Sequence, residues 1–159
     1  MMDDRQPVTI LLVEDDDGHA RLLEKNLRRG GLINQLVRVT DGQEALDYVA
    51  RSSPYEDAER YPFPSVVLLD VRMPRLDGFE VLAHLKRDPD LMKIPVIMLT
   101  STDNQAEINR AYEMGANGYV VKPVGVQSFI DRVVKLGMFI EVIELPDSTG
   151  RTEHAAVNA

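Results

Sequence analysis

The chain contains no cysteine in its 159 residues. Without thiols it can form neither a disulfide framework nor a thiolate metal site. Residues 1–7 lack the apolar core of a secretory signal, so we expect a cytoplasmic protein. The sequence has no Gly-Lys dipeptide and no Gly-x-Ser-x-Gly pattern, which argues against a P-loop nucleotide site and a hydrolase nucleophile elbow.

Positive charge is in deficit. The 18 Lys and Arg residues are outnumbered by 26 Asp and Glu residues, which gives a net charge of −8. A nucleic-acid surface needs a basic footprint that neutralises phosphates, so this balance argues against nucleic acid and favours a charged protein partner. With 44% hydrophobic residues the chain is long enough for one sizeable core, and we expect a single domain.

Short apolar runs alternate with helical patterns along the sequence. The runs predict strands at residues 8–13, 36–39, 65–69, 95–99 and 118–121. The helical patterns predict helices at residues 16–29, after Gly42, at 78–87, from a capping box at Asn104 and Glu107 to Gly115, and at 126–143. Five strands alternating with five helices predict a doubly wound α/β fold around a parallel sheet. We place this domain at residues 8–145, between an N-terminal arm at 1–7 and a disordered tail at 146–159.

Carboxylates follow the first and third predicted strands. Glu14 and Asp15 end the first run, and Asp70 ends the third. Because parallel strands end at the same edge of a sheet, we expect these groups to meet there, where a hard divalent cation would offset their repulsion. Thr100 and Lys122 end the fourth and fifth runs at the same edge. The joint pattern predicts a metal pocket in which Asp70 accepts a phosphoryl group.

Taken in order, these motifs resemble the receiver domain of two-component response regulators. The family's hallmarks are an acidic pair, a phosphoacceptor Asp, a switch Thr or Ser, and a Lys-Pro pair. The matching segments are Val13-Glu14-Asp15-Asp16, Asp70-Val71-Arg72-Met73-Pro74, Leu99-Thr100-Ser101 and Gly118-Tyr119-Val120-Val121-Lys122-Pro123. The resemblance implies a flavodoxin-like sheet of order 2-1-3-4-5 and a phosphoacceptor switch, which is not an enzyme although it assists its own phosphotransfer and slow dephosphorylation.

The resemblance also implies a role for each residue of the acidic pocket. Asp70 is phosphorylated by a histidine kinase. Asp15 and Asp70 bind Mg²⁺ together with the backbone carbonyl of Arg72, and Glu14 holds a metal-bound water. Oxygen ligands around a partly hydrated cation are what Mg²⁺ prefers.

Three further residues have implied roles after phosphorylation. Lys122 pairs with Asp70 and then with a phosphoryl oxygen, and a cis peptide bond before Pro123 turns its side chain inward. The hydroxyl of Thr100 bonds a phosphoryl oxygen, and Tyr119 fills the space that Thr100 leaves. Outside this set, His19 and His84 lie on polar helix faces without a second ligand at zinc spacing, and we interpret both as solvated.

Residues 51–64 make an unusually long connection between the second helix and the third strand. Its tyrosines, Phe63 and three prolines favour an ordered surface loop anchored to the domain. With the C-terminal extension, this loop resembles the single-domain regulators that partner phytochrome-type histidine kinases. Few residues follow the fifth helix, so we expect output through protein binding rather than through a second domain.

The segment at 126–143 is more apolar than one domain face requires. An inward stripe at helical spacing consists of Phe129, Val133, Leu136 and Ile140. Charged residues within the segment exclude a membrane span. The remaining apolar residues predict a homodimer interface through this helix and the fifth strand: Ile130, Val134, Phe139, Val142 and Ile143.

Two alternatives share parts of the pattern. A metal-dependent phosphohydrolase also uses an Asp nucleophile, but after its first strand and with a second Asp two residues later, whereas here that strand ends Glu14-Asp15-Asp16. A flavin mononucleotide binder shares the sheet. Its phosphate would be repelled by clustered carboxylates, and the first loop offers no Ser or Thr donors.

Overall fold

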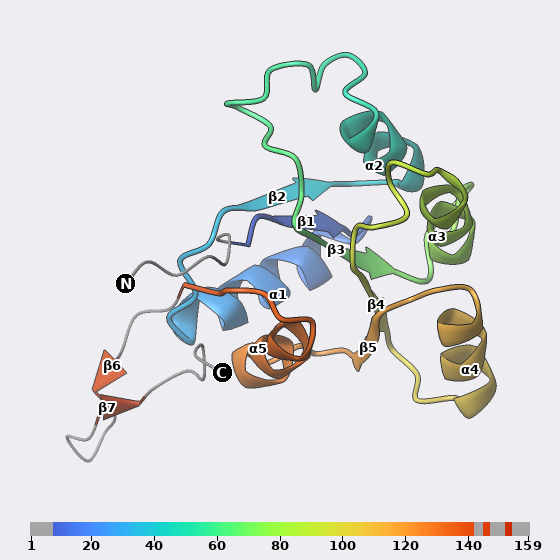
Figure 1. Cartoon of the computed structure of the whole chain (residues 1–159). Coiled ribbons are helices and arrows are strands. Elements are labelled where there is room, and N and C mark those ends of the chain that lie inside the picture. Colours follow the sequence, from blue (N-terminus) through green and yellow to red (C-terminus); the bar gives the residue numbers. More distant parts are fainter. Residues whose placement is uncertain (1–7, 142–144, 147–151, 154–159) are drawn as a thin grey trace.

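The computed structural model describes residues 8–141, 145–146 and 152–153. A central sheet of five parallel strands, in the order β2-β1-β3-β4-β5, carries helices on both faces (Figure 1). This arrangement confirms the predicted fold class and strand order. The predicted N-terminal arm at residues 1–7 lies outside the described residues.

The elements follow one another in strict alternation. The strands of the sheet are β1 (Ile10–Val13), β2 (Leu36–Val39), β3 (Val66–Asp70), β4 (Val96–Thr100) and β5 (Gly118–Val121). The helices are α1 (Asp17–Arg29), α2 (Gly42–Val49), α3 (Gly78–Arg87), α4 (Gln105–Glu113) and α5 (Val126–Lys135). Two short strands, β6 (Leu145–Pro146) and β7 (Thr152–Glu153), form an antiparallel pair. All of this pair except Leu145 lies in the segment predicted to be disordered, and the rest of that segment lies outside the described residues.

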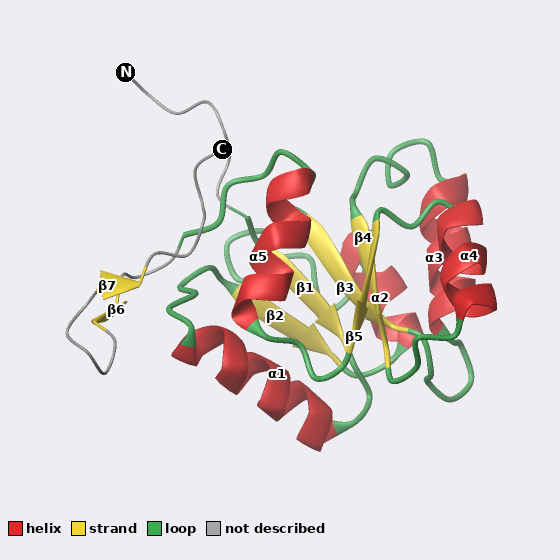
Figure 2. Cartoon of the chain, turned by 90° about the horizontal axis from the view of Figure 1, so that it is seen from below, coloured by secondary structure: helices red, strands yellow, loops and turns green. Residues whose placement is uncertain are grey.

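Two apolar layers enclose the sheet. Helices α1 and α5 cover one face, and α2, α3 and α4 cover the other (Figure 2). Along β1, Ile10 and Leu12 belong to the first layer, whereas Leu11 and Val13 belong to the second. The strands read as continuous apolar runs because both faces of the sheet are buried. None of the described helices is long and apolar enough to cross a membrane.

Most helices begin at a polar cap. Asp16, Asp41 and Asp77 each accept a hydrogen bond from a backbone N–H in the first turn of the helix that follows. Asn104 does the same for the N–H of Glu107, but the predicted reciprocal bond from the Glu107 side chain is not made. That carboxylate instead bonds groups of the functional site, described below.

Helix α5 is shorter than predicted. It ends at Lys135, and Gly137 takes a φ of +74°, a left-handed conformation that terminates helices. The chain then runs beside the N-terminal ends of the strands, where the carbonyl of Phe139 accepts from Val8 N–H at 3.0 Å. The prediction of a helix to residue 143 was therefore wrong, because apolar spacing alone does not mark where the chain leaves the helix.

This correction changes the predicted dimer surface. Ile130 has no exposed surface and belongs to the core of its own protomer, so it is unavailable to a partner chain. Val134 and Phe139 are half-buried, and Phe139 lies beyond the helix. Val142 and Ile143 lie outside the described residues. The apolar side chains of α5 pack into the core of their own protomer.

The long connection at residues 51–64 is anchored by three aromatic rings. The rings of Tyr48, Tyr55 and Tyr61 lie within 5.0–6.0 Å of one another. The hydroxyl of Tyr48 donates to the carbonyl of Pro62 at 2.6 Å, and that of Tyr55 donates to Glu44 at 2.8 Å. The loop is ordered and held against α2, as predicted.

Candidate functional site

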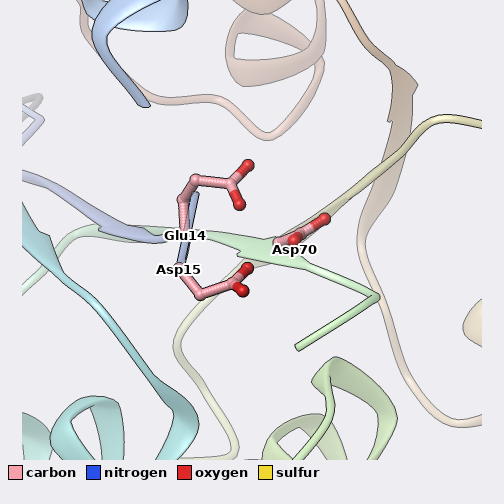
Figure 3. Close-up of side chains that lie close together, drawn as sticks. All are labelled: Glu14, Asp15 and Asp70. Atoms are coloured by element: carbon pink, nitrogen blue, oxygen red, sulfur yellow. The ribbon is translucent and has the colours of Figure 1, made fainter. Parts of the chain in front are cut away.

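Three carboxylates meet at the carboxyl edge of the sheet. Glu14 and Asp15 follow β1, and Asp70 is the last residue of β3. One oxygen of each lies within 4.8 Å of the others (Figure 3). Glu14 and Asp70 are buried, with 1% and 4% of their surface exposed, whereas Asp15 is exposed. The predicted convergence of these residues is confirmed.

Lys122, the residue after β5, supplies a counter-charge. Its ammonium nitrogen lies 3.0 Å from Oδ1 of Asp70 and donates to Oε1 of Glu14 at 2.5 Å. The side chain is 14% exposed, so both ion pairs are largely removed from water. The peptide bond between Lys122 and Pro123 is cis, in agreement with the resemblance.

The pocket shifts the titration of its own groups. Burial, followed by the negative charge of Glu14, raises the pKa of Asp70 to about 7, although Lys122 opposes the shift. Burial works against the charged form of Lys122, but its bonds to Glu14 and Asp70 outweigh this and raise its pKa. A cation that enters the pocket would stabilise the charged form of Asp70 and so lower its raised pKa.

Thr100 and Tyr119 meet at a fourth carboxylate. The hydroxyl of Thr100, at the end of β4, donates to Oε2 of Glu107 at 2.8 Å, and the hydroxyl of Tyr119 lies at 2.8 Å from the same oxygen. The Tyr119 hydroxyl is also 2.9 Å from the carbonyl of Thr102. The ring of Tyr119 is buried already in this structure. The roles predicted for both residues after phosphorylation stay predictions.

Arg72 lies two residues beyond Asp70, and its guanidinium pairs with Oε1 of Glu107 at 2.7 Å. The role predicted for its backbone carbonyl in binding metal stays a prediction. Arg38 was missed: its guanidinium donates to the carbonyl of Glu14 at 2.8 and 3.0 Å and to Asp17 at 2.7 Å, which fixes the start of the acidic pocket. The available signal was an arginine inside an otherwise apolar strand.

His19 was interpreted as a solvated residue, and its side chain is indeed 54% exposed. Its Nδ1 nevertheless lies 3.3 Å from the ammonium group of Lys122 and 3.8 Å from Glu14, at the rim of the pocket. No sequence spacing indicates this contact, because 103 residues separate His19 from Lys122.

Residues 10–134 match the model of the response regulator receiver domain. The chain belongs to the response regulator receiver family. This assignment confirms the resemblance drawn from the motifs.

Several relatives are similar to this receiver over most of their length. Response regulator Rcp1 of Synechocystis sp. is 34% identical over 141 residues, 88% of this chain and 94% of Rcp1. The crystal structure of the Mn²⁺-bound form of Rcp1 superposes with a TM-score of 0.66, covering 89% of this chain and 100% of that one.

Two other solved structures belong to phytochrome-associated regulators. The bacteriophytochrome response regulator AtBRR is 39% identical, with a TM-score of 0.75 over 87% of this chain and 98% of that chain. The phosphorylated cyanobacterial phytochrome response regulator RcpA is 33% identical, with a TM-score of 0.67 over 82% and 91%. The narrower resemblance to this subgroup is therefore confirmed as well.

Proposed function

We propose that this receiver accepts a phosphoryl group on Asp70 from a histidine kinase and signals through altered protein binding. The observation that carries the proposal is the position of Asp70, buried between two further carboxylates and 3.0 Å from the ammonium group of Lys122. The family favours this function over the phosphohydrolase and flavin-binding alternatives. RcpA, which is described as phosphorylated, adds support.

The donor set fits Mg²⁺ because it consists of hard oxygen ligands and no nitrogen or sulfur. Asp15 and Asp70 would bind the ion with the Arg72 carbonyl, and Glu14 would hold a bound water. When bound, the ion would neutralise negative charge on the carboxylates and on the incoming phosphoryl oxygens. The Mn²⁺-bound form of Rcp1 shows that a relative of this chain binds a divalent cation, which supports the proposal.

In the proposed transfer, an oxygen lone pair of Asp70 attacks the phosphorus of a phosphohistidine. The P–O bond forms as the P–N bond breaks, and the bonding pair stays on the ring nitrogen. The second ring nitrogen already carries a proton, so neutral imidazole leaves. Before the transfer, the ammonium group of Lys122 pairs with the Asp70 oxygen and holds it in place. After the transfer, it pairs with a phosphoryl oxygen.

We infer that the kinase is of the phytochrome type, as the relatives AtBRR and RcpA suggest. A pocket of about 280 Å³ beside Lys122 gives the kinase an apolar binding surface close to the phosphoacceptor. Its apolar lining comes from α1 and from the segment after β5: Leu22, Leu23, Pro123 and Val124. Leu22 is 47% exposed, which suits a surface that a partner covers.

The test of this function is Mg²⁺-dependent binding of beryllofluoride, which mimics a phosphoryl group on aspartate. The unaltered receiver should bind it only with Mg²⁺, and Asp70→Asn should abolish binding because the amide offers no anionic oxygen. Fluorine NMR measures the bound species. Asp131→Asn on the exposed face of α5 is the matched control and should bind normally. Undiminished binding by Asp70→Asn would refute the function.

The homodimer also stays a proposal, with its surface revised to the exposed side of α5 and β5. Val121 at the end of β5 is 40% exposed. We expect light scattering after gel filtration to give twice the mass of one chain, and Val121→Ser to shift the mass towards one chain. Leu22→Ser, on the opposite helix of that layer, should have no such effect. A clean monomer at micromolar concentration contradicts the proposal.

A further inference from the structure

One carboxylate on α4 connects three segments of the site. Oε2 of Glu107 accepts from the hydroxyls of Thr100 and Tyr119, each at 2.8 Å, and Oε1 pairs with Arg72 at 2.7 Å. The Glu107 side chain is only 11% exposed. Its charge is therefore balanced by these partners more than by water. The carboxylate joins the segment after β3, the end of β4 and the interior of β5 to the first turn of α4.

The hydroxyl of Thr100 is committed to this carboxylate. Thr100 has no exposed surface, and its oxygen already accepts a bond from the N–H of Thr102 at 3.2 Å. A hydroxyl carries a single proton and can donate it to one acceptor at a time. The proposed function asks the same proton to be donated to a phosphoryl oxygen on Asp70, which lies on the neighbouring strand.

We propose that Glu107 is a positioning residue that competes with the phosphoryl group for Thr100. This inference rests on the proposed function. In the resting receiver, Glu107 takes the place of the phosphoryl group as the anionic partner of Thr100. Phosphorylation of Asp70 must withdraw that hydroxyl from Glu107. Breaking this bond lowers the affinity of the pocket for the phosphoryl group.

Arg72 is shared by the same two anions. Its guanidinium is held by Glu107, yet its side chain is 69% exposed and its backbone lies two residues from Asp70. A phosphoryl group on Asp70 offers the guanidinium a second anionic acceptor. Glu107 lies in the first turn of α4. The exchange of its partners therefore couples the phosphorylation of Asp70 to that helix. The groove of about 600 Å³ between α4 and the β3–α3 loop, which Arg72 and Glu107 both line, is the surface that changes.

The first test is the affinity of Glu107→Gln for beryllofluoride in saturating Mg²⁺. The neutral amide is a weaker acceptor for Thr100, so we expect binding about fivefold tighter than in the unaltered receiver, the effect of replacing one charge-assisted hydrogen bond by a neutral one. Glu113→Gln removes an exposed carboxylate from the same helix and should leave the affinity unchanged. The Mg²⁺ affinity without beryllofluoride should be equal in all three proteins, which shows that the pocket is intact.

A double-mutant cycle separates competition from a general loss of negative charge. In a Thr100→Val background the contested hydroxyl is absent, so adding Glu107→Gln should give a smaller gain in beryllofluoride affinity, namely the part that comes from releasing Arg72. An equal gain in both backgrounds would overturn the proposal, because Thr100 would then contribute nothing to the effect. Unchanged or weaker binding by Glu107→Gln would overturn it too.

These outcomes are distinct from failure of the proposed function. If the unaltered receiver binds beryllofluoride with dependence on Asp70 and Mg²⁺ while Glu107→Gln gives no gain, the competition is refuted and the phosphoacceptor function stands. If the unaltered receiver does not bind, or if Asp70→Asn binds equally well, the function itself is refuted and the competition falls with it.

Discussion

Replacing Lys122 by methionine is expected to lower the free energy of unfolding of the metal-free receiver by about 3 kcal/mol at pH 8, the cost of leaving buried charges without their partner. Lys122 is the cation between Glu14 and Asp70, at 2.5 and 3.0 Å. Without it, the two buried carboxylates repel each other. Urea unfolding in the presence of a chelator measures the loss.

The same variant should respond to pH and to metal in a characteristic way. The pKa of Asp70 is already about 7 with Lys122 in place, and removing the cation raises it further. The destabilisation should therefore shrink as the pH falls from the raised pKa of the variant towards 7 and one carboxylate takes up a proton, and Mg²⁺ should relieve it at pH 8. Lys93→Met removes an exposed lysine and serves as the control. A loss that is equal at pH 5.5 and pH 8 would contradict this account.

Local patterns were sufficient to predict the fold. Each strand of the sheet is an apolar run because helices cover both faces, and polar caps such as Asp16 and Asp77 mark where helices begin. The site followed from the fold, since parallel strands place their carboxyl ends together. The sequence alone therefore predicts that three side chains lie close together: Asp15, Asp70 and Lys122.

The errors came from features that local sequence does not determine. Apolar spacing continues past Leu136 to Ile140, but the left-handed Gly137 ends α5 and Ile140 is buried from a different segment. Glu107 stands at the capping-box position of α4, yet donors from other segments take its carboxylate instead. Its partner Arg72 is 35 residues away, and only tertiary structure decides which bond is made.

Asp70→Asn is expected to stabilise the metal-free receiver at pH 8. The pKa of Asp70 is about 7 in the folded protein, well above its ordinary value of 3.8, so the native state binds the proton more tightly than the unfolded chain does. Stability contributed by the protonated form is full at low pH and is lost as the pH rises from about 4 to about 7. The amide cannot ionise, and the variant avoids this loss.

The size of the effect follows from the same shift. Each unit of pKa corresponds to about 1.4 kcal/mol, which sets an upper bound of about 4 kcal/mol on the gain at pH 8, with little difference between the two proteins at pH 4. Mg²⁺ should reverse the order, because it binds the native carboxylate and stabilises only the unaltered receiver. Thermal unfolding across pH, with and without Mg²⁺, measures both effects, and Asp131→Asn is the control. The contrary result is an Asp70→Asn variant that is less stable than the unaltered receiver at pH 8 without metal. It would show that the attraction of Lys122 fully offsets the repulsion on the Asp70 carboxylate, so that no repulsion is left in the pocket for a cation to relieve.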